Sequence, residues 1–223
     1  MVGYANGCGS TENPANELKT LYSEATSAFT YYTYDAYGKT LSSGPSSIST
    51  CLHYDAAARP SSVAEPSGSP AITMTYNAAG LRASYTVTPS GGGPTLSEQF
   101  TYRGSQLAQT AVVSGTTAYT DTYVYSQHGM PLELLRDTAG VANRYWYERD
   151  GLGNVVALTD VSGNVVDQYA YDLWGTPTLV QETVPQQLRY QGYWYDNELG
   201  WYWLDSVVMS EAIRPKAAKD FRA

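Results

Sequence analysis

The chain has 223 residues, with 13 lysine and arginine residues against 21 aspartate and glutamate residues, which gives a formal net charge of −8. This balance excludes the basic face that binds phosphates, so we predict no nucleic-acid partner, and an anionic membrane surface is disfavoured for the same reason. No run of 18 apolar residues is present, so no membrane insertion is predicted.

The N-terminal segment, residues 1–29, gives weak structural signals. Residues 1–6 have neither a basic n-region nor an apolar h-region, so no signal peptide is predicted there. An Asn-Pro pair begins residues 13–25, where a short helix, a strand or disorder are the alternatives. Cys8 and Cys51 would pair only if their Cα atoms lie within about 7 Å, and we favour two unpaired, small hydrophobic side chains.

Tyrosine is over-used, with 21 tyrosines and 5 tryptophans against 3 phenylalanines. Eight of the tyrosines recur at intervals of 20 to 26 residues, namely Tyr34, Tyr54, Tyr76, Tyr102, Tyr125, Tyr147, Tyr171 and Tyr195. Most of them end a Tyr-x-Tyr or similar triplet; an aspartate or asparagine often follows, with a glycine three residues later, as in residues 32–38 and 169–175. Self-similarity at a nearly fixed period is the signature of a repeat architecture.

Each part of this unit has a physical role. The period of two in Tyr-x-Tyr places both rings on one face of a strand. The aspartate or asparagine begins a type I turn, and the glycine supplies the positive φ that such turns often need. Asp-led turns at residues 137–140 and 160–163 reverse the chain at the far ends of strands. We therefore predict an all-β fold, a meander of short antiparallel strands in a curved sheet.

Outside the strands, residues 42–49 and 84–94 are rich in serine, glycine and proline and are predicted to be loops. Residues 210–223 have a partly helical pattern that Pro215 interrupts.

Repeat positions are expected to be structural rather than chemical. They are Tyr34, Asp35, Gly38, Tyr54, Asp55, Tyr76, Asn77, Gly80, Tyr125, Tyr147, Gly153, Tyr171, Asp172, Gly175, Tyr195, Asp196 and Gly200. Acid chemistry or calcium binding is the alternative for the aspartates. Calcium-binding solenoids use dense Gly-Asp nonapeptides, which this chain lacks, so turn formation is the preferred interpretation.

Other candidate chemistry is sparse. His53 and His128 lie in different repeats and share no converging ligands, so no metal site, no cofactor and no catalytic residue is predicted. Residues 151–154, Gly-Leu-Gly-Asn, lack the Lys-Ser/Thr of a phosphate loop and are predicted to form a hairpin turn.

Tryptophans gather near the end of the chain, at Trp194, Trp201 and Trp203, with Trp174 nearby. An exposed aromatic face binds carbohydrates or protein partners. The alternative, which repetition in register favours, is that these rings stack across strands and stabilise the sheet.

The recurring Tyr-x-Tyr-Asp-x-x-Gly-[Arg/Lys]-Leu unit resembles the YD repeat of Rhs-type proteins over residues 30–204. Residues 145–160, 169–175 and 188–196 resemble the RHS-repeat-associated core domain. In this mostly bacterial family of secreted or surface proteins, the repeats coil into a hollow β-shell. In toxin members the shell encloses a C-terminal toxin domain, and the core domain plugs it.

The resemblance implies four regions. Residues 1–29 are an N-terminal segment or incomplete repeat, 30–144 are YD repeats, 145–204 are a core-like region and 205–223 are a divergent tail. The implied function is a structural shell fragment, secreted or at the cell surface, with other YD repeats or a C-terminal toxin domain as partners. The alternative is an aromatic-faced module that binds a cell-surface carbohydrate or protein.

The family's aspartyl self-cleavage motif, Asp-Pro-x-Gly-Leu, is missing, and no Asp-Pro pair occurs anywhere in the chain. We therefore expect no enzyme activity. A residual aspartyl self-cleavage by Asp196 or Asp205 is the alternative.

Overall fold

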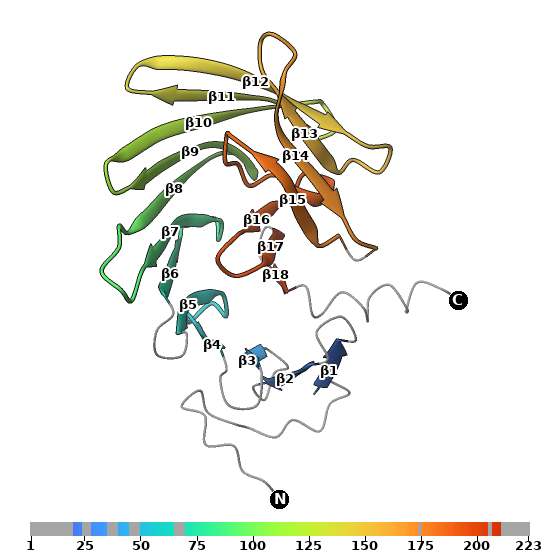
Figure 1. Cartoon of the computed structure of the whole chain (residues 1–223). Coiled ribbons are helices and arrows are strands. Elements are labelled where there is room, and N and C mark those ends of the chain that lie inside the picture. Colours follow the sequence, from blue (N-terminus) through green and yellow to red (C-terminus); the bar gives the residue numbers. More distant parts are fainter. Residues whose placement is uncertain are drawn as a thin grey trace, which may run out of the picture. The chain divides into compact units, whose positions relative to one another are not determined.

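A computed structural model of the chain describes residues 20–23, 28–34, 40–44, 50–64, 70–173, 175–204 and 207–210 (Figure 1). The chain divides into two compact units. Unit 1 comprises residues 1–75 and 84–97, and unit 2 comprises residues 76–83 and 98–223.

Nearly all of the regular structure in the described residues is β. The elements are β1 (Thr20–Ser23), β2 (Ala28–Tyr34), β3 (Thr40–Gly44), β4 (Thr50–Tyr54), β5 (Pro60–Ala64), β6 (Ala71–Tyr76), β7 (Arg82–Thr88), β8 (Leu96–Arg103), β9 (Gln106–Ser114), β10 (Thr117–Tyr125), β11 (Pro131–Thr138), β12 (Val141–Arg149), β13 (Val155–Thr159), β14 (Val165–Tyr171), β15 (Pro177–Glu182), the 3-10 turn η1 (Tyr190–Gly192), β16 (Trp194–Asp196), β17 (Trp201–Leu204) and β18 (Val207–Ser210).

The strands β1 to β15 follow one another in chain order within one sheet, and β16, β17 and β18 form a second sheet. Neighbouring strands pair antiparallel, for example β10 with β11 and β12 with β13. This is the arrangement expected when every strand is followed by a tight turn and pairs with its neighbour in sequence. The predicted all-β antiparallel meander is confirmed.

One turn geometry recurs between strands. In each case the N–H of the first residue donates to the carbonyl of the residue four positions later. The carbonyl of the first residue accepts a hydrogen bond from the N–H of the residue three positions later. Turns of this kind begin at Asp55, Asn77, Ser126, Asp150, Asp160 and Asp172. At Asp150 the carboxylate also accepts the N–H groups of Leu152 and Asn154, both at 2.9 Å, and Gly153 has a φ of 88°. The aspartates at these positions are therefore turn formers, as the sequence predicts.

Acid should weaken these turns. Hydrogen bonds from the side chains of Arg59 and Asn164 lower the pKa of Asp55 and Asp160, respectively. A lowered pKa contributes stability above the unfolded-state value of about 3.8, and this stability is lost as the pH falls through the lower folded-state pKa. We expect the free energy of unfolding of Asp160→Asn, measured by urea denaturation, to fall less steeply at acid pH than that of the wild type. Glu148→Gln, which removes an exposed carboxylate outside the turns, should show the same fall as the wild type. An equal effect of both variants would contradict this role of the turn aspartates.

Tyrosines form much of the core of unit 2. Tyr123 in β10 and Tyr147 in β12 are buried and lie opposite Leu134 and Leu158, which are fully buried, in the neighbouring strands. Such cross-strand pairs are the unit of sheet stabilisation. Burial raises the pKa of both tyrosines well above the usual value, so they stay neutral. These residues serve the scaffold.

Three sequence expectations need correction. A helix over residues 13–25 is wrong where the structure describes that range, because Thr20–Ser23 is a strand paired with β2. The two expected loops are wrong in part: residues 42–44 lie in β3, and residues 84–88 lie in β7, where Tyr85 and Val87 are buried. Cys51 is disulfide-bonded, so it is not an unpaired side chain.

Several expectations fall outside the described residues. These are Cys8, Asp35, Gly38, Trp174, Asp205, residues 45–49 and the tail from residue 211. The described part of the chain contains no helix with the length and apolar character of a membrane span.

Candidate functional site

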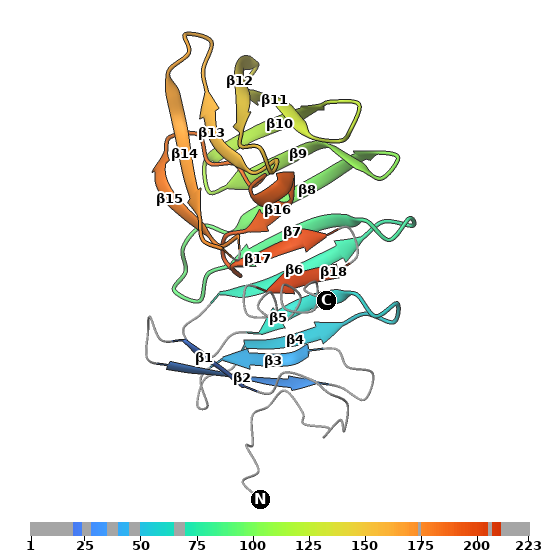
Figure 2. The same cartoon turned by 90° about the vertical axis from the view of Figure 1, so that its right-hand side faces the viewer.

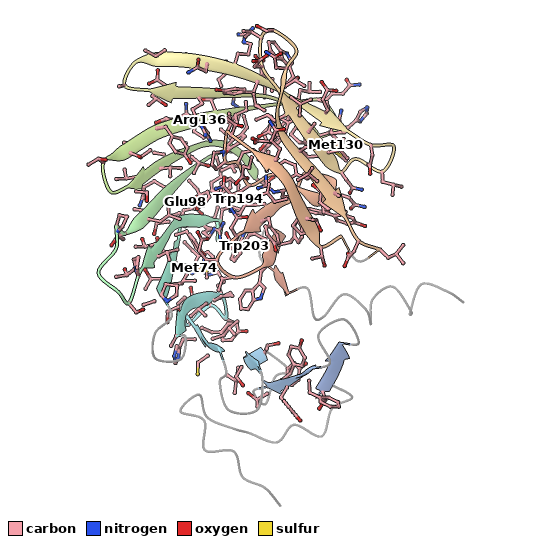
Figure 3. All side chains as sticks on the ribbon, in the orientation of Figure 1. Met74, Glu98, Met130, Arg136, Trp194 and Trp203 are labelled. Carbon is pink, nitrogen blue, oxygen red and sulfur yellow. The ribbon has the colours of Figure 1, made fainter. Side chains whose placement is uncertain are left out.

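After β15 the chain turns onto the inner face of the curved sheet of unit 2. In Figures 1 and 2, strands β9 to β15 curve around β16 and β17. Residues 183–204, named the inner segment below, include η1, β16 and β17. Figure 3 shows Glu98, Trp194 and Trp203 close together at this contact. The inner segment and the side chains that hold it are the candidate functional site.

A buried ion pair joins the sheet to the inner segment. Arg82, at the start of β7, donates to both carboxylate oxygens of Asp196 in β16, at 2.7 and 2.9 Å. Arg82 is 1% exposed and Asp196 is 3% exposed. Asp196 also accepts a hydrogen bond from Trp194 Nε1 at 3.0 Å. A bidentate pair of this kind is strong and directional, and breaking it would leave a charge buried in the interior.

Aromatic rings enclose this ion pair. The guanidinium carbon of Arg82 lies 4.6 Å from the ring centroid of Phe100 and 4.7 Å from that of Trp203. Phe100 meets Trp194 edge to face, with ring centroids 5.1 Å apart. Cation–π contacts strengthen when water is excluded, as it is here. Aromatic side chains from β8, β16 and β17 therefore fix the position of the arginine that binds the inner segment.

A second arginine holds the beginning of the inner segment. Arg136 in β11 pairs bidentately with Asp121 in β10, at 2.7 and 2.6 Å, and also donates to the carbonyl of Pro185 at 2.7 Å. The ring of Tyr119 covers its guanidinium at 3.9 Å. Burial alone would lower the pKa of Arg136, but the hydrogen bond and charge of Asp121 outweigh it and raise that pKa. Burial also raises the pKa of Asp121, although the hydrogen bond and charge of Arg136 oppose that rise.

A third arginine belongs to the inner segment itself. Arg189 donates to Glu182 at the end of β15, at 2.8 Å, and its guanidinium lies 3.8 Å from the ring centroid of Tyr169 in β14. Nearby, Gln186 is fully buried, accepts the N–H of Leu188 at 2.7 Å and donates to Tyr169 Oη at 3.3 Å. Buried polar groups cost free energy unless they are hydrogen-bonded, so these contacts define one arrangement of the segment.

The turn at residues 189–193 has the repeat's backbone hydrogen bonds but not its capping residue. Arg189 N–H donates to the Tyr193 carbonyl and Gly192 N–H donates to the Arg189 carbonyl. Arginine offers no acceptor oxygen to cap the turn. Instead, Gln191 N–H donates to Oδ1 of Asn154, at 3.1 Å, from the sheet. Asn154 is itself held by Asp150, so one turn of the meander caps the turn of the inner segment.

Replacing Asn154 with alanine should lower the free energy of unfolding by about 0.5–1.5 kcal/mol, because the part-buried hydrogen bond from Gln191 N–H would be lost. Asn164 is the matched control. It occupies the equivalent position in the turn that begins at Asp160 and donates to that aspartate in the same way, but it is exposed. Chemical denaturation should therefore show a smaller loss for Asn164→Ala. Equal losses would mean that the contact with Gln191 contributes nothing.

The three predicted binding tryptophans are placed together, but inside the protein. Trp194 is 5% exposed, and Trp201 and Trp203 are each 7% exposed. Trp194 and Trp203 border a cavity of about 270 Å³, which Tyr102 and Gln106 also line. The ligand-binding role of these tryptophans stays a prediction, and their burial accords with the packing alternative.

Among the predicted repeat positions, Asp196 departs from the others. Its carbonyl accepts the N–H of Gly200, as in a turn, but its carboxylate turns inward to Arg82. His53 lies in β4 and His128 in the turn after β10. Within the described residues, no group of three or more histidine, cysteine or acidic side chains is arranged to hold a metal ion.

No family model matches the chain. It is 31% identical over 138 residues to the tRNA3(Ser)-specific nuclease WapA of Bacillus spizizenii, an alignment covering 60% of this chain and 6% of that protein. It is 30% identical over 106 residues to the tRNA nuclease WapA of Bacillus subtilis, which covers 46% of this chain and 4% of that protein. The chain thus spans a small part of the length of the curated relatives it matches.

Among solved structures, the chain is similar to the Photorhabdus luminescens Tc holotoxin pore with the TccC3-D651A mutation. The TM-score is 0.59 at 12% identity, and the match covers 83% of this chain and 11% of that chain. At this identity the likeness concerns the fold, an antiparallel β-sheet. The fold and the WapA likeness together support a relationship to Rhs-type, toxin-related proteins.

Proposed function

We propose that this chain is a structural wall segment of an Rhs-type β-shell, and that the inner segment closes the concave side of that wall. The observation that carries this proposal is the buried contact between Arg82 and Asp196, supported by Arg136 and Arg189. Three buried arginines hold a short segment against a sheet. Buried polar contacts of this kind are typical of a structural segment that is held in one defined geometry.

The regions and partners follow from the same proposal. Residues 30–144 supply wall repeats, residues 145–204 a core-like region that includes the inner segment, and residues 205–223 a divergent tail. Other YD repeats extend the sheet, and a C-terminal toxin domain is the enclosed partner. The intact protein is secreted or lies at the cell surface. The names of the relatives, two tRNA nucleases and a holotoxin pore, support a toxin-associated role.

We propose that the chain itself has no catalytic activity. Asp196, one candidate for residual self-cleavage, is committed to Arg82 and Trp194 and is 3% exposed, so it has no access to a scissile bond in solution. Incubated alone, the chain should keep its intact mass of 24.3 kDa, and it should leave added tRNA uncleaved. If the chain or the tRNA is cleaved, and Asp196→Asn abolishes that cleavage, this part of the proposal is refuted.

An aromatic-faced binding module is the weaker candidate, because the three tryptophans that would form its face are buried.

The wall function is testable in a hybrid protein. The chain would replace the 138-residue matching region in the WapA of Bacillus spizizenii. If it is a wall segment of the same kind, the hybrid should resist limited proteolysis as the parent does. The same hybrid with Arg82→Gln should be cut by the protease within the grafted chain. The hybrid with Arg144→Gln, which changes an ion pair whose arginine is exposed, should be no more sensitive to the protease than the unmodified hybrid. Digestion of the unmodified hybrid throughout its length would reject the wall function.

A further inference from the structure

Glu98 is a buried carboxyl group at the contact between the sheet and the inner segment. It lies in β8, is 2% exposed, and points to the same face as Phe100, which packs on Trp194. Its hydrogen-bond partner in the structure is Gln187 of the inner segment, whose Nε2 lies 3.5 Å from Glu98 Oε1. This is a long contact for a carboxylate, which normally accepts short, charge-assisted bonds.

The charges around Glu98 are unbalanced. Arg82 in β7 is a cationic neighbour whose charge lowers the pKa of Glu98, and it is already bound through both Nη atoms to Asp196 in β16. The negative charges of three other carboxylates raise the pKa of Glu98: Asp196, Glu198 in the turn after β16, and Asp121 in β10, which is paired with Arg136. Glu98 and Asp196 therefore compete for the guanidinium of Arg82, and all three side chains are buried.

We propose that Glu98 is a proton-controlled catch for the inner segment: when neutral it packs against Gln187, and when ionised it places a second carboxylate beside the Arg82–Asp196 pair and loosens the segment. This inference rests on the proposed wall function, because it assumes that the inner segment is docked. The balance of charge is simple. Loss of one proton from Glu98 adds one negative charge to the contact, and no cation arrives to offset it.

The direction of the pH dependence follows from linkage. Burial raises the pKa of Glu98 from 4.5 to about 8, with the nearby carboxylates adding to the shift and Arg82 opposing it. A carboxyl group with a raised pKa stabilises the docked state fully below about pH 4.5, and this contribution is lost as the pH rises to about 8. Over this range the docking equilibrium falls by up to about tenfold per pH unit. Docking should therefore be about fiftyfold weaker at pH 8 than at pH 6.

Native-state hydrogen exchange tests this catch on the full chain. The protection factor of Val155 N–H in β13, which donates to the Arg189 carbonyl of the inner segment, should fall about fiftyfold between pH 6 and pH 8. In Glu98→Gln it should stay constant, and in Glu148→Gln, which changes an exposed carboxylate, it should fall as in the wild type. The same fall in Glu98→Gln, or a constant value in the wild type, would overturn the catch.

A second measurement on the unmodified chain covers the case in which Glu98→Gln does not fold. Infrared spectroscopy should show a protonated carboxylic acid at neutral pH that ionises near pH 8, and its absence at pH 6 would overturn the proposal. The two levels of inference fail differently. No protection of Val155 N–H at pH 6 would reject the docked segment, and with it the wall function. Protection that does not change with pH would reject the catch alone.

Discussion

Replacing Arg82 with methionine should lower the free energy of unfolding of unit 2 by about 3–5 kcal/mol in urea denaturation, because Asp196 would be left buried without its counter-charge. The loss exceeds that of an ordinary ion pair for two reasons. Within the described part of the chain, the carboxylate keeps one other side-chain donor, Trp194 Nε1, and the rings of Phe100 and Trp203 would lose the cation they enclose.

The double variant Arg82→Met/Asp196→Leu should recover most of this loss, since apolar replacements of a buried pair are often close to neutral. Arg144→Met is the matched control. Arg144 pairs with Glu133 but is 54% exposed, so the change should cost no more than about 1 kcal/mol. If Arg82→Met costs no more than Arg144→Met, the buried pair does not hold the inner segment.

Replacing Gly192 with alanine is the second large effect that we expect. Gly192 has a φ of 74°, and a Cβ there would lie 2.8 Å from Cδ of Pro131, whose ring cannot move aside as a flexible side chain would. The positive φ alone costs about 1–2 kcal/mol for a residue with a Cβ. Forcing an atom into packed surroundings adds typically 1–3 kcal/mol.

Gly163 separates these two contributions. Its φ is 79°, close to that of Gly192, and a Cβ there would meet nothing within 4 Å. Gly163→Ala should therefore show the conformational cost alone, and Gly192→Ala should be more destabilising in the same denaturation experiment. Equal losses would show that the inner segment does not approach β11 as closely as the structure places it.

The local architecture was predictable because it depends on residues close together in the sequence. Tyr-x-Tyr alternation and the turn that begins at Asp150 each carry their own signal, and the structure confirms both. The loop expected over residues 84–94 was wrong for residues 84–88, because the serine, glycine and proline content was given more weight than the alternation of Tyr85 and Val87, which marks a strand. Composition was the weaker signal there, and periodicity the stronger.

The inner segment was not predictable, because its contacts join residues far apart in the chain. Arg82 and Asp196 are 114 positions apart, and nothing beside either residue indicates a partner. A single arginine or glutamate in a strand is normally expected to face solvent, so Arg136 and Glu98 gave no sign of burial. The sequence of the turn at residues 189–193 did indicate a contact with a distant residue. It keeps the glycine of the repeat but has arginine where the other turns have an acceptor, which implies an acceptor from elsewhere.

The central claim is that the inner segment packs on the inner face of the sheet in unit 2. Solution NMR of the full chain at pH 6 tests it most directly, through nuclear Overhauser contacts between the rings of Phe100 and Trp194, whose centroids lie 5.1 Å apart, and between those of Tyr76 and Trp203, at 5.8 Å. We predict that both contacts are observed and are lost in Arg82→Met. Their absence from the wild type, with the contacts between β10 and β11 intact, would contradict the account.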